Sequence, residues 1–356
     1  ILFSIVALSL IAVSCSDDST TGPDKKNYQV PSNYNFENVN FSGQTTRLAM
    51  IDEIIEKMEE SRSGTVVSSK TIIAMLNNFG NLFSDPNLNA SDKNIYSKLE
   101  PNSYSFFTDL LSEMDKTDPT ATAENGKGGI VQSKDGVKKY FISAKGHDFG
   151  EMMEKGLMGA LMLYQVNHYL SDEEIGIGVD NKTVVEGEGT AMQHHWDEAF
   201  GYFGAPKEFP LSVEGVKFVA KYCNSKNSIT NYNKLIMDEG YLRGRAAINN
   251  NDTDTKWESV KCVKKYWELI FVTTAVHYLN GAKANFTDDA LRTHQLSECW
   301  GFLWAIQFNS VTKGNYYQLA LDKLGDNFWD ISVNQIDEAI DILTEGYKLQ
   351  SIKSEL

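Results

Sequence analysis

The sequence predicts an all-α protein made of duplicated helical bundles, with one small β-hairpin inserted. Three observations carry this prediction. Apolar residues recur at helical spacing through most of the chain, proline is scarce at 7 of 356 residues, and a pair of histidine-bearing helices occurs twice in the same order. Hydrophobic residues make up 42% of the chain, so a substantial core can form.

The N-terminal segment is typical of a secretory signal. Residues 1–14 are apolar and uncharged, and they are too few to span a bilayer, which takes about 20 residues. Small or aliphatic residues precede Cys15 in the pattern that a lipoprotein signal peptidase reads, so we expect cleavage there and a lipid on Cys15. The alternative is an ordinary signal peptide or a buried core helix. If the lipoprotein signal is cleaved as expected, residues 15–33 are the lipidated cysteine and a polar, flexible tether.

The distribution of charge in the sequence indicates where the protein is located and which partners it can bind. The residues after Cys15 are acidic, which resembles the export signal of surface-exposed lipoproteins in some Gram-negative bacteria. We therefore expect an outer-membrane lipoprotein on the cell surface, with a periplasm-facing protein as the alternative. The net charge of −15 argues against nucleic acid as a partner and favours cations.

Helical periodicity begins near Thr45, where Leu48, Ile51 and Ile55 share one face. We expect residues 34–350 to form one helical domain of two related bundles. Further segments of the same periodicity cover 69–84, 103–115, 149–170, 189–203, 212–224, 230–249, 254–281, 287–308, 315–324 and 333–350.

One passage breaks the helical pattern. Residues 130–142 contain two short strand-like runs around Asp135-Gly136, a common two-residue hairpin turn. A glycine-rich stretch precedes them. We therefore expect a β-hairpin insertion within residues 126–145.

An internal repeat holds most of the 6 histidines. The tripeptide His-Tyr-Leu occurs at 168–170 and at 277–279, each near the end of a predicted helix. In the helices that follow, histidine, glutamate and glycine recur in the same order, His194 with His294, Glu198 with Glu298, and Gly201 with Gly301. The two matches together indicate a duplicated helix pair.

The repeated helices carry candidate metal ligands. His195 and Glu198 are three residues apart, whereas His194 and Glu198, like His294 and Glu298, are four apart, so each pair shares a helix face. Imidazole and carboxylate groups that project into a helical bundle commonly bind iron, zinc or manganese. The alternative is a buried hydrogen-bonded pair that orients two helices.

For the remaining histidines we expect structural roles. His168 and His277 lie on apolar stripes. His147 and Glu151 form one more pair four residues apart, and there we expect helix capping by Asp148 rather than chemistry. No HExxH, GxSxG or phosphate-loop motif is present. Three buried thiols, or one disulfide and one thiol, are both compatible with Cys223, Cys262 and Cys299.

Five segments resemble an uncharacterised lipoprotein family, domain of unknown function 4856. That family is similar to imelysin-like proteins, which are built from two related four-helix bundles and carry a GxHxxE motif proposed to bind metal. His195 and Glu198 match the HxxE part, while Gln193 stands where the motif has glycine. The segments are 34–47, 155–161, 194–204, 276–280 and 294–298, including HHWDEAFGYFG.

The residues and the resemblance predict a cell-envelope lipoprotein that binds iron, zinc or another divalent metal, or a metal-bearing ligand such as haem, and serves uptake. The predicted ligands are His195 and Glu198, with four possible partners, His194, Asp197, His294 and Glu298.

Two alternatives stay open. One is a metal-dependent hydrolase or peptidase-like protein in which Glu198 or Glu298 acts as general base. The other is a structural or adaptor lipoprotein beside an outer-membrane transporter, with Tyr202, Phe203 and Phe209 as exposed contact points.

Overall fold

The computed structural model describes residues 28–309 and 311–356. The predicted signal, Cys15 and the tether up to residue 27 lie outside the described residues. Helices dominate, and the described part of the chain contains one two-stranded sheet, so the predicted all-α class with a small hairpin is confirmed. None of the helices in this part is long and apolar enough to cross a membrane.

The helices follow the predicted segments closely, with short 3-10 turns at 60–63, 96–98, 101–103 and 350–352. The first half holds α1 (Ser42–Glu59), α2 (Ser69–Leu76), α3 (Pro86–Ala90), α4 (Tyr104–Lys116), α5 (Phe149–Leu157), α6 (Tyr164–Tyr169), α7 (Asp172–Ile175) and α8 (Ala191–Phe203). The second half holds α9 (Phe218–Ser225), α10 (Asn227–Thr230), α11 (Tyr232–Leu235), α12 (Leu242–Asn249), α13 (Thr253–Ala284), α14 (Asp289–Ile306), α15 (Tyr316–Leu324) and α16 (Val333–Gly346).

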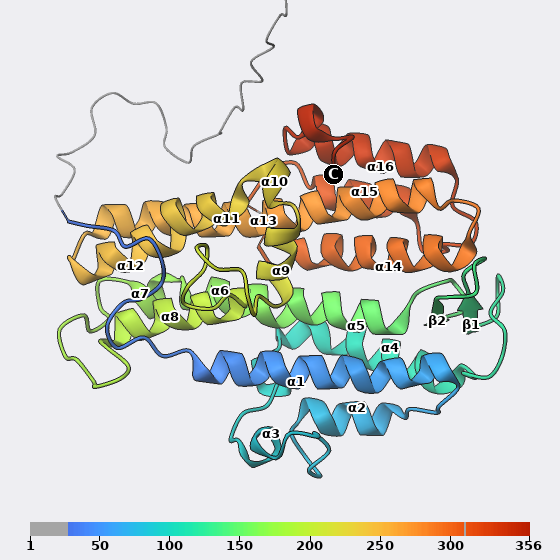
Figure 1. Cartoon of the computed structure of the whole chain (residues 1–356), viewed down its shortest axis with the longest axis horizontal. Helices are drawn as coiled ribbons and strands as arrows, with labels where there is room; N and C mark the ends of the chain where they lie inside the picture. Colours follow the sequence, from blue (N-terminus) through green and yellow to red (C-terminus); the bar gives the residue numbers. More distant parts are fainter. Residues whose placement is uncertain (1–27, 310) are drawn as a thin grey trace, which may run out of the picture.

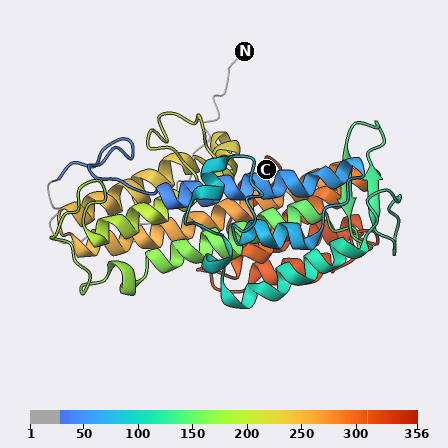
Figure 2. The ribbon, with the colours of Figure 1, turned by 90° about the horizontal axis from the view of Figure 1, so that it is seen from below.

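The longest helices run along one axis of the molecule (Figure 1). α13 packs along α14, α14 packs on α5, and α12 packs on α13. α1 contacts both α5 and α8 and lies below them in Figure 1, and Figure 2, seen from below, shows it running along the long axis of the molecule. The helix pairs that carry the sequence repeat are therefore held in one continuous body.

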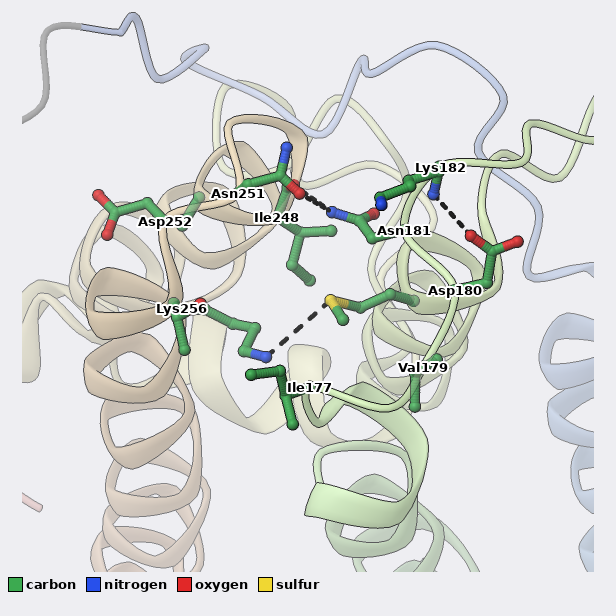
Figure 3. A pocket seen from close by; sticks show the side chains of 12 residues that line it. Ile177, Val179, Asp180, Asn181, Lys182, Ile248, Asn251, Asp252 and Lys256 are labelled. Atoms are coloured by element: carbon green, nitrogen blue, oxygen red, sulfur yellow. Dashed lines mark hydrogen bonds between the residues drawn. The ribbon is translucent and has the colours of Figure 1, made fainter.

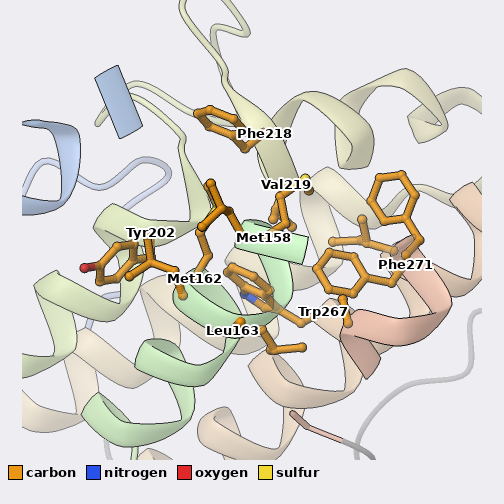
Figure 4. Packing of buried hydrophobic residues seen from close by; sticks show 14 of the residues in the cluster. Met158, Met162, Leu163, Tyr202, Phe218, Val219, Trp267 and Phe271 are labelled. Atoms are coloured by element: carbon orange, nitrogen blue, oxygen red, sulfur yellow. The ribbon is translucent and has the colours of Figure 1, made fainter. Parts of the chain in front are cut away.

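Wide helical turns join some of the helices into longer rods. A π-helical segment, Met158–Leu163, links α5 to α6, and a second, Ile236–Tyr241, links α11 to α12. All six residues of the first segment are buried, and its five side chains are fully so. Figure 4 shows Met158, Met162 and Leu163 packed near Trp267 of α13, so this segment lies in the middle of the core.

Strands β1 (Gly129–Gln132) and β2 (Lys139–Ile142) pair antiparallel, with Val131 opposite Tyr140. The turn is longer than the two residues predicted. The Ser133 N–H donates to the Lys138 carbonyl at 3.0 Å, and the Gly136 N–H donates to the Ser133 carbonyl at 2.8 Å. Gly136 has φ +76, the left-handed conformation that glycine tolerates best. Both strands contact α14.

The structure also tests the predicted state of the cysteines and the predicted exposure of three aromatic side chains. Cys223, Cys262 and Cys299 are buried thiols, and no disulfide joins them in the described structure. The prediction that Tyr202, Phe203 and Phe209 are exposed contact points is wrong. All three side chains are fully buried, because the end of α8 turns Tyr202 and Phe203 into the core and the Phe209 ring of the following loop packs against Phe203, with centroids 5.8 Å apart.

Candidate metal centre

Helix α14 supplies the first two groups of the site. His294 and Glu298 lie one turn apart, and the His294 Nε2 is 3.9 Å from a Glu298 carboxylate oxygen. Asp288 starts this helix by accepting hydrogen bonds from the Ala290 and Leu291 N–H groups. The predicted pairing of His294 with Glu298 on one helix face is present.

The start of α5 supplies two more groups. Asp148 accepts hydrogen bonds from the Gly150 and Glu151 N–H groups, which confirms the predicted helix cap. Its other carboxylate oxygen lies 3.1 Å from the His294 Nδ1, and a Glu151 oxygen lies 3.8 Å from the same atom.

Together these residues form a compact constellation. One ligand atom from each of Asp148, Glu151 and His294 lies within 4.8 Å of the others. With the adjacent Glu298 we name this set the histidine–carboxylate cluster. Asp148 and Glu151 were absent from the predicted ligands, because the partnership between the α5 and α14 residues is tertiary.

Two basic side chains border the cluster. The Lys155 ammonium, 1% exposed, lies 2.8 Å from a Glu151 oxygen and 3.6 Å from a Glu298 oxygen. The Arg62 guanidinium, 24% exposed, lies 3.4 Å from Glu151 and 3.6 Å from Asp148. The difference in burial means that Arg62 can leave the cluster at lower cost than Lys155.

The hairpin covers the histidine. The Tyr140 ring of β2 stacks on the His294 ring, with centroids 4.1 Å apart and planes 12° from parallel. The Arg62 guanidinium lies over the Tyr140 ring, 5.3 Å from its centroid. Burial raises the pKa of Tyr140 to about 12, so the phenol stays neutral. The β-hairpin thus holds the His294 ring in place.

Charge is divided unequally between two neighbouring carboxyl groups. Burial raises the pKa of Glu298 well above its usual range, and the Glu151 charge adds to this effect against the attraction of Lys155. The pKa of Glu151 is lowered despite its burial, because Lys155 and His294 favour its anion. This division makes Glu298 the carboxyl group that holds a proton and Glu151 the one that is ionised.

The predicted pair in the first repeat has a similar internal geometry. The His194 Nε2 lies 4.0 Å from a Glu198 oxygen, and the other Glu198 oxygen accepts a hydrogen bond from the Gln44 amide at 2.9 Å. Here a neutral amide occupies the place that Lys155 takes beside Glu298. The two helix pairs of the predicted repeat therefore present different chemistry.

His195 and Glu198, the favoured ligand pair, have different partners. The His195 Nδ1 lies 3.0 Å from a Glu174 carboxylate oxygen, whose second oxygen lies 3.1 Å from the His168 Nε2. Residues three apart on a helix differ by about 60° in direction, which lets these two side chains turn to separate neighbours. Within residues 28–309 and 311–356, the structure does not bring them to one ligand point.

Asp197, another predicted ligand, is not part of the histidine–carboxylate cluster. It is fully buried and accepts hydrogen bonds from the Tyr34 hydroxyl and from the Arg245 Nε, both at 2.8 Å. Burial raises the pKa of Asp197 to about 6, although Arg245 opposes the rise. These two hydrogen bonds connect Asp197 of α8 to Tyr34, in the segment before α1, and to Arg245 of α12.

Equivalent glycines explain how each glutamate meets its neighbour. A Cβ on Gly301 would lie 2.4 Å from the Lys155 Cβ, and a Cβ on Gly201 would lie 2.9 Å from the Gln44 Cβ. Glycine at both positions lets α5 approach α14, and α1 approach α8, closely enough for side-chain contact. The glycine repeated in the sequence thus has a packing role in both helix pairs.

The fold and the cluster define a helical-bundle protein with a buried histidine–carboxylate constellation at one end. The chain belongs to the family described as domain of unknown function (DUF4856), whose model matches residues 27–346. The resemblance to that family is thereby confirmed. No curated protein and no solved structure matches the chain, so the likeness to imelysin-like proteins stays a prediction.

Proposed function

We propose that this protein is a cell-envelope lipoprotein that binds a divalent metal ion at the histidine–carboxylate cluster and serves metal uptake. The observation that carries the proposal is the convergence of Asp148, Glu151 and His294 ligand atoms within 4.8 Å. Two carboxylates and an imidazole suit iron, zinc or manganese. Convergence on this scale favours a single ion over haem. The lipid anchor on Cys15 and the cell-surface location remain part of the proposal.

Binding would require two rearrangements that the site permits. The ion would replace the proton on Glu298, and it would displace the partly exposed Arg62 from Asp148 and Glu151. The buried Lys155 would stay in place and hold the anionic form of Glu151. One divalent ion thus substitutes for the charges of one proton and one guanidinium.

Metal content tests the proposal directly. The full chain, purified without chelators, would be loaded with Fe²⁺, Zn²⁺ or Mn²⁺ and analysed by elemental mass spectrometry. We expect near-stoichiometric metal that is lost in His294→Ala and Glu151→Gln. The matched variants His194→Ala and Glu198→Gln should retain it. Loss in the latter pair alone would move the site to the first repeat, and absence of metal from the folded wild type would reject the proposal.

The ion pairs of the cluster favour a second candidate, a structural role in an adaptor lipoprotein beside an outer-membrane transporter. In this case Arg62 and Lys155 are the permanent partners of the carboxylates. Arg62→Met separates the two functions. Removing a competitor should strengthen metal binding about tenfold, or about 1.4 kcal/mol, whereas a purely structural cluster would lose stability and bind no metal.

Hydrolysis receives less support from this geometry. A catalytic metal needs an open coordination position for water. Asp148, Glu151 and Glu298 are buried, and Tyr140 covers one face of His294. The arrangement favours holding an ion over presenting it to a substrate.

A further inference from the structure

A pocket of about 350 Å³ lies at the end of the molecule opposite the hairpin. Its walls come from the loop after α7, the start of α8 and the connection from α12 to α13. This volume falls in the range of small-molecule sites, which begins at roughly 300 Å³. Figure 3 shows Lys256 of α13 reaching into the pocket between Ile177 and Ile248.

Lys256 gives the pocket its chemical character. The residue is 3% exposed, and its ammonium group contacts the Ile175 carbonyl and, at 3.9 Å, the Met192 sulfur. Within the described residues no carboxylate lies within 4.0 Å of this ammonium; Asp172 attracts it from farther away, and the Trp257 ring centroid lies 4.6 Å from it. A buried cation without a counter-ion in contact is costly, and a ligand anion would relieve that cost.

The acidic residues of the lining are engaged elsewhere. Asp180 accepts hydrogen bonds from the Lys182 and Thr183 N–H groups, and Asp252 accepts one from the Thr255 N–H and one from the Tyr28 hydroxyl. Two acids and two lysines leave the lining neutral overall. A monoanion is therefore a better match for Lys256 than a doubly charged phosphate, which the two aspartates would repel.

The rest of the lining favours an apolar body on the ligand. Ile248 and Met192 are buried in the wall, while Ile177 is 99% exposed beside the opening. An apolar side chain so fully exposed to water gains from contact with an alkyl group. We infer that this pocket is a binding site for a small monocarboxylic acid with an alkyl chain, whose carboxylate pairs with the Lys256 ammonium. The site is separate from the metal cluster and does not depend on it.

Octanoate is the probe that tests this inference, by isothermal titration calorimetry on the full chain. We expect saturable binding that weakens at least about tenfold in Lys256→Met. Lys182→Met, which removes the other lysine of the lining, should change the affinity much less. Octanol and octyl phosphate should both bind more weakly than octanoate.

A second measurement keeps the test valid if Lys256→Met unfolds. In the wild-type protein with ¹³C-labelled methionine methyl groups, octanoate should shift the Met192 resonance, assigned from Met192→Leu. Absence of saturable octanoate binding at millimolar concentration, equal affinity in a folded Lys256→Met variant, or an unshifted Met192 resonance would each overturn the inference.

Discussion

Glu298 is the residue whose protonation links pH to metal binding. Its pKa lies well above the usual range of a carboxyl group, chiefly because the side chain is buried. The metal-free protein therefore holds a proton that an incoming cation must displace, and the affinity should rise with pH. Calorimetry in buffers of different ionisation enthalpy should detect proton release on binding. Glu298→Gln should abolish this release, and unchanged release in that variant would contradict the assignment.

His147 predicts a second pH effect, on stability. Burial lowers the pKa of His147 to about 4, against about 6.5 for an unfolded histidine. The unfolded chain therefore binds the extra proton first, and stability is lost as the pH falls from about 6.5 towards 4. Urea unfolding of wild type and His147→Gln should show this loss, on the order of 1–2 kcal/mol, in the wild type alone. Parallel pH profiles would be inconsistent with a partly buried, neutral imidazole.

At the scale of elements, the crossing of α5 and α14 depends on Gly301. An alanine there would place its Cβ 2.4 Å from the Lys155 Cβ, so α5 would have to move away. We expect Gly301→Ala to cost about 1–3 kcal/mol of unfolding free energy and also to weaken metal binding. Gly201→Ala is the matched control at the crossing of α1 and α8.

The two glycine variants should differ in one respect. Gly201→Ala should lower the melting temperature by a similar amount but leave metal binding intact, because its crossing lies beside Glu198. Equal metal binding by both variants would show that the α5–α14 distance does not control the cluster.

Local periodicity was enough to predict most helices, because each buries one stripe of side chains against its neighbours. The end of α2 was less predictable. The predicted helix over 69–84 stops at Leu76, and Asn78, Gly80 and Asn81 then adopt left-handed conformations. The hairpin was predictable from Asp135-Gly136, but the length of its turn was not. That length depends on two hydrogen bonds of the Ser133 backbone, one to the Lys138 carbonyl and one from the Gly136 N–H.

The site was predictable only where its geometry is local. The pairing of His294 with Glu298 follows from a four-residue spacing on one helix. Asp148 and Glu151 meet them because α5 crosses α14, and the hairpin adds Tyr140. The spacing of His147 and Glu151 drew attention to the start of α5, but a single helix could not show that Glu151 faces His294; the spacing of Glu151 and Lys155 was a further local signal there. His195 and Glu198 were favoured as ligands from their spacing alone, which could not show that the His195 ring contacts Glu174 instead.

At the scale of the whole molecule, the Asp197–Arg245 pair fastens the N-terminal segment to the bundle. Both side chains are fully buried, and Tyr34 donates to the same Asp197 oxygen as Arg245. Asp197→Asn would leave the guanidinium without a charged partner, so we expect a loss of about 3–5 kcal/mol in unfolding free energy. Denaturant titration checks this value. A loss below about 1 kcal/mol, the range of exposed ion pairs, would contradict the account, and metal binding should be unaffected.

The two proposed sites lie at opposite ends of the long axis, the cluster beside β1 and β2 and the pocket beside α7 and α12 (Figure 1). Ligands at such distant sites should stabilise the protein independently, each according to its own affinity and concentration. The first repeat helix pair contributes a wall to the pocket through α8, and the second holds the cluster through α14. The duplication that the sequence predicts would thus be compatible with two different ligand chemistries.

The position of a bound metal tests the central claim most directly. Crystals of the full chain loaded with Zn²⁺ would be measured at the zinc absorption edge. The account predicts an anomalous peak about 2.0–2.2 Å from a His294 ring nitrogen, with Asp148 and Glu151 oxygens as further ligands. A peak beside His195 or Glu198, or zinc-loaded crystals with no peak at the histidine–carboxylate cluster, would contradict it.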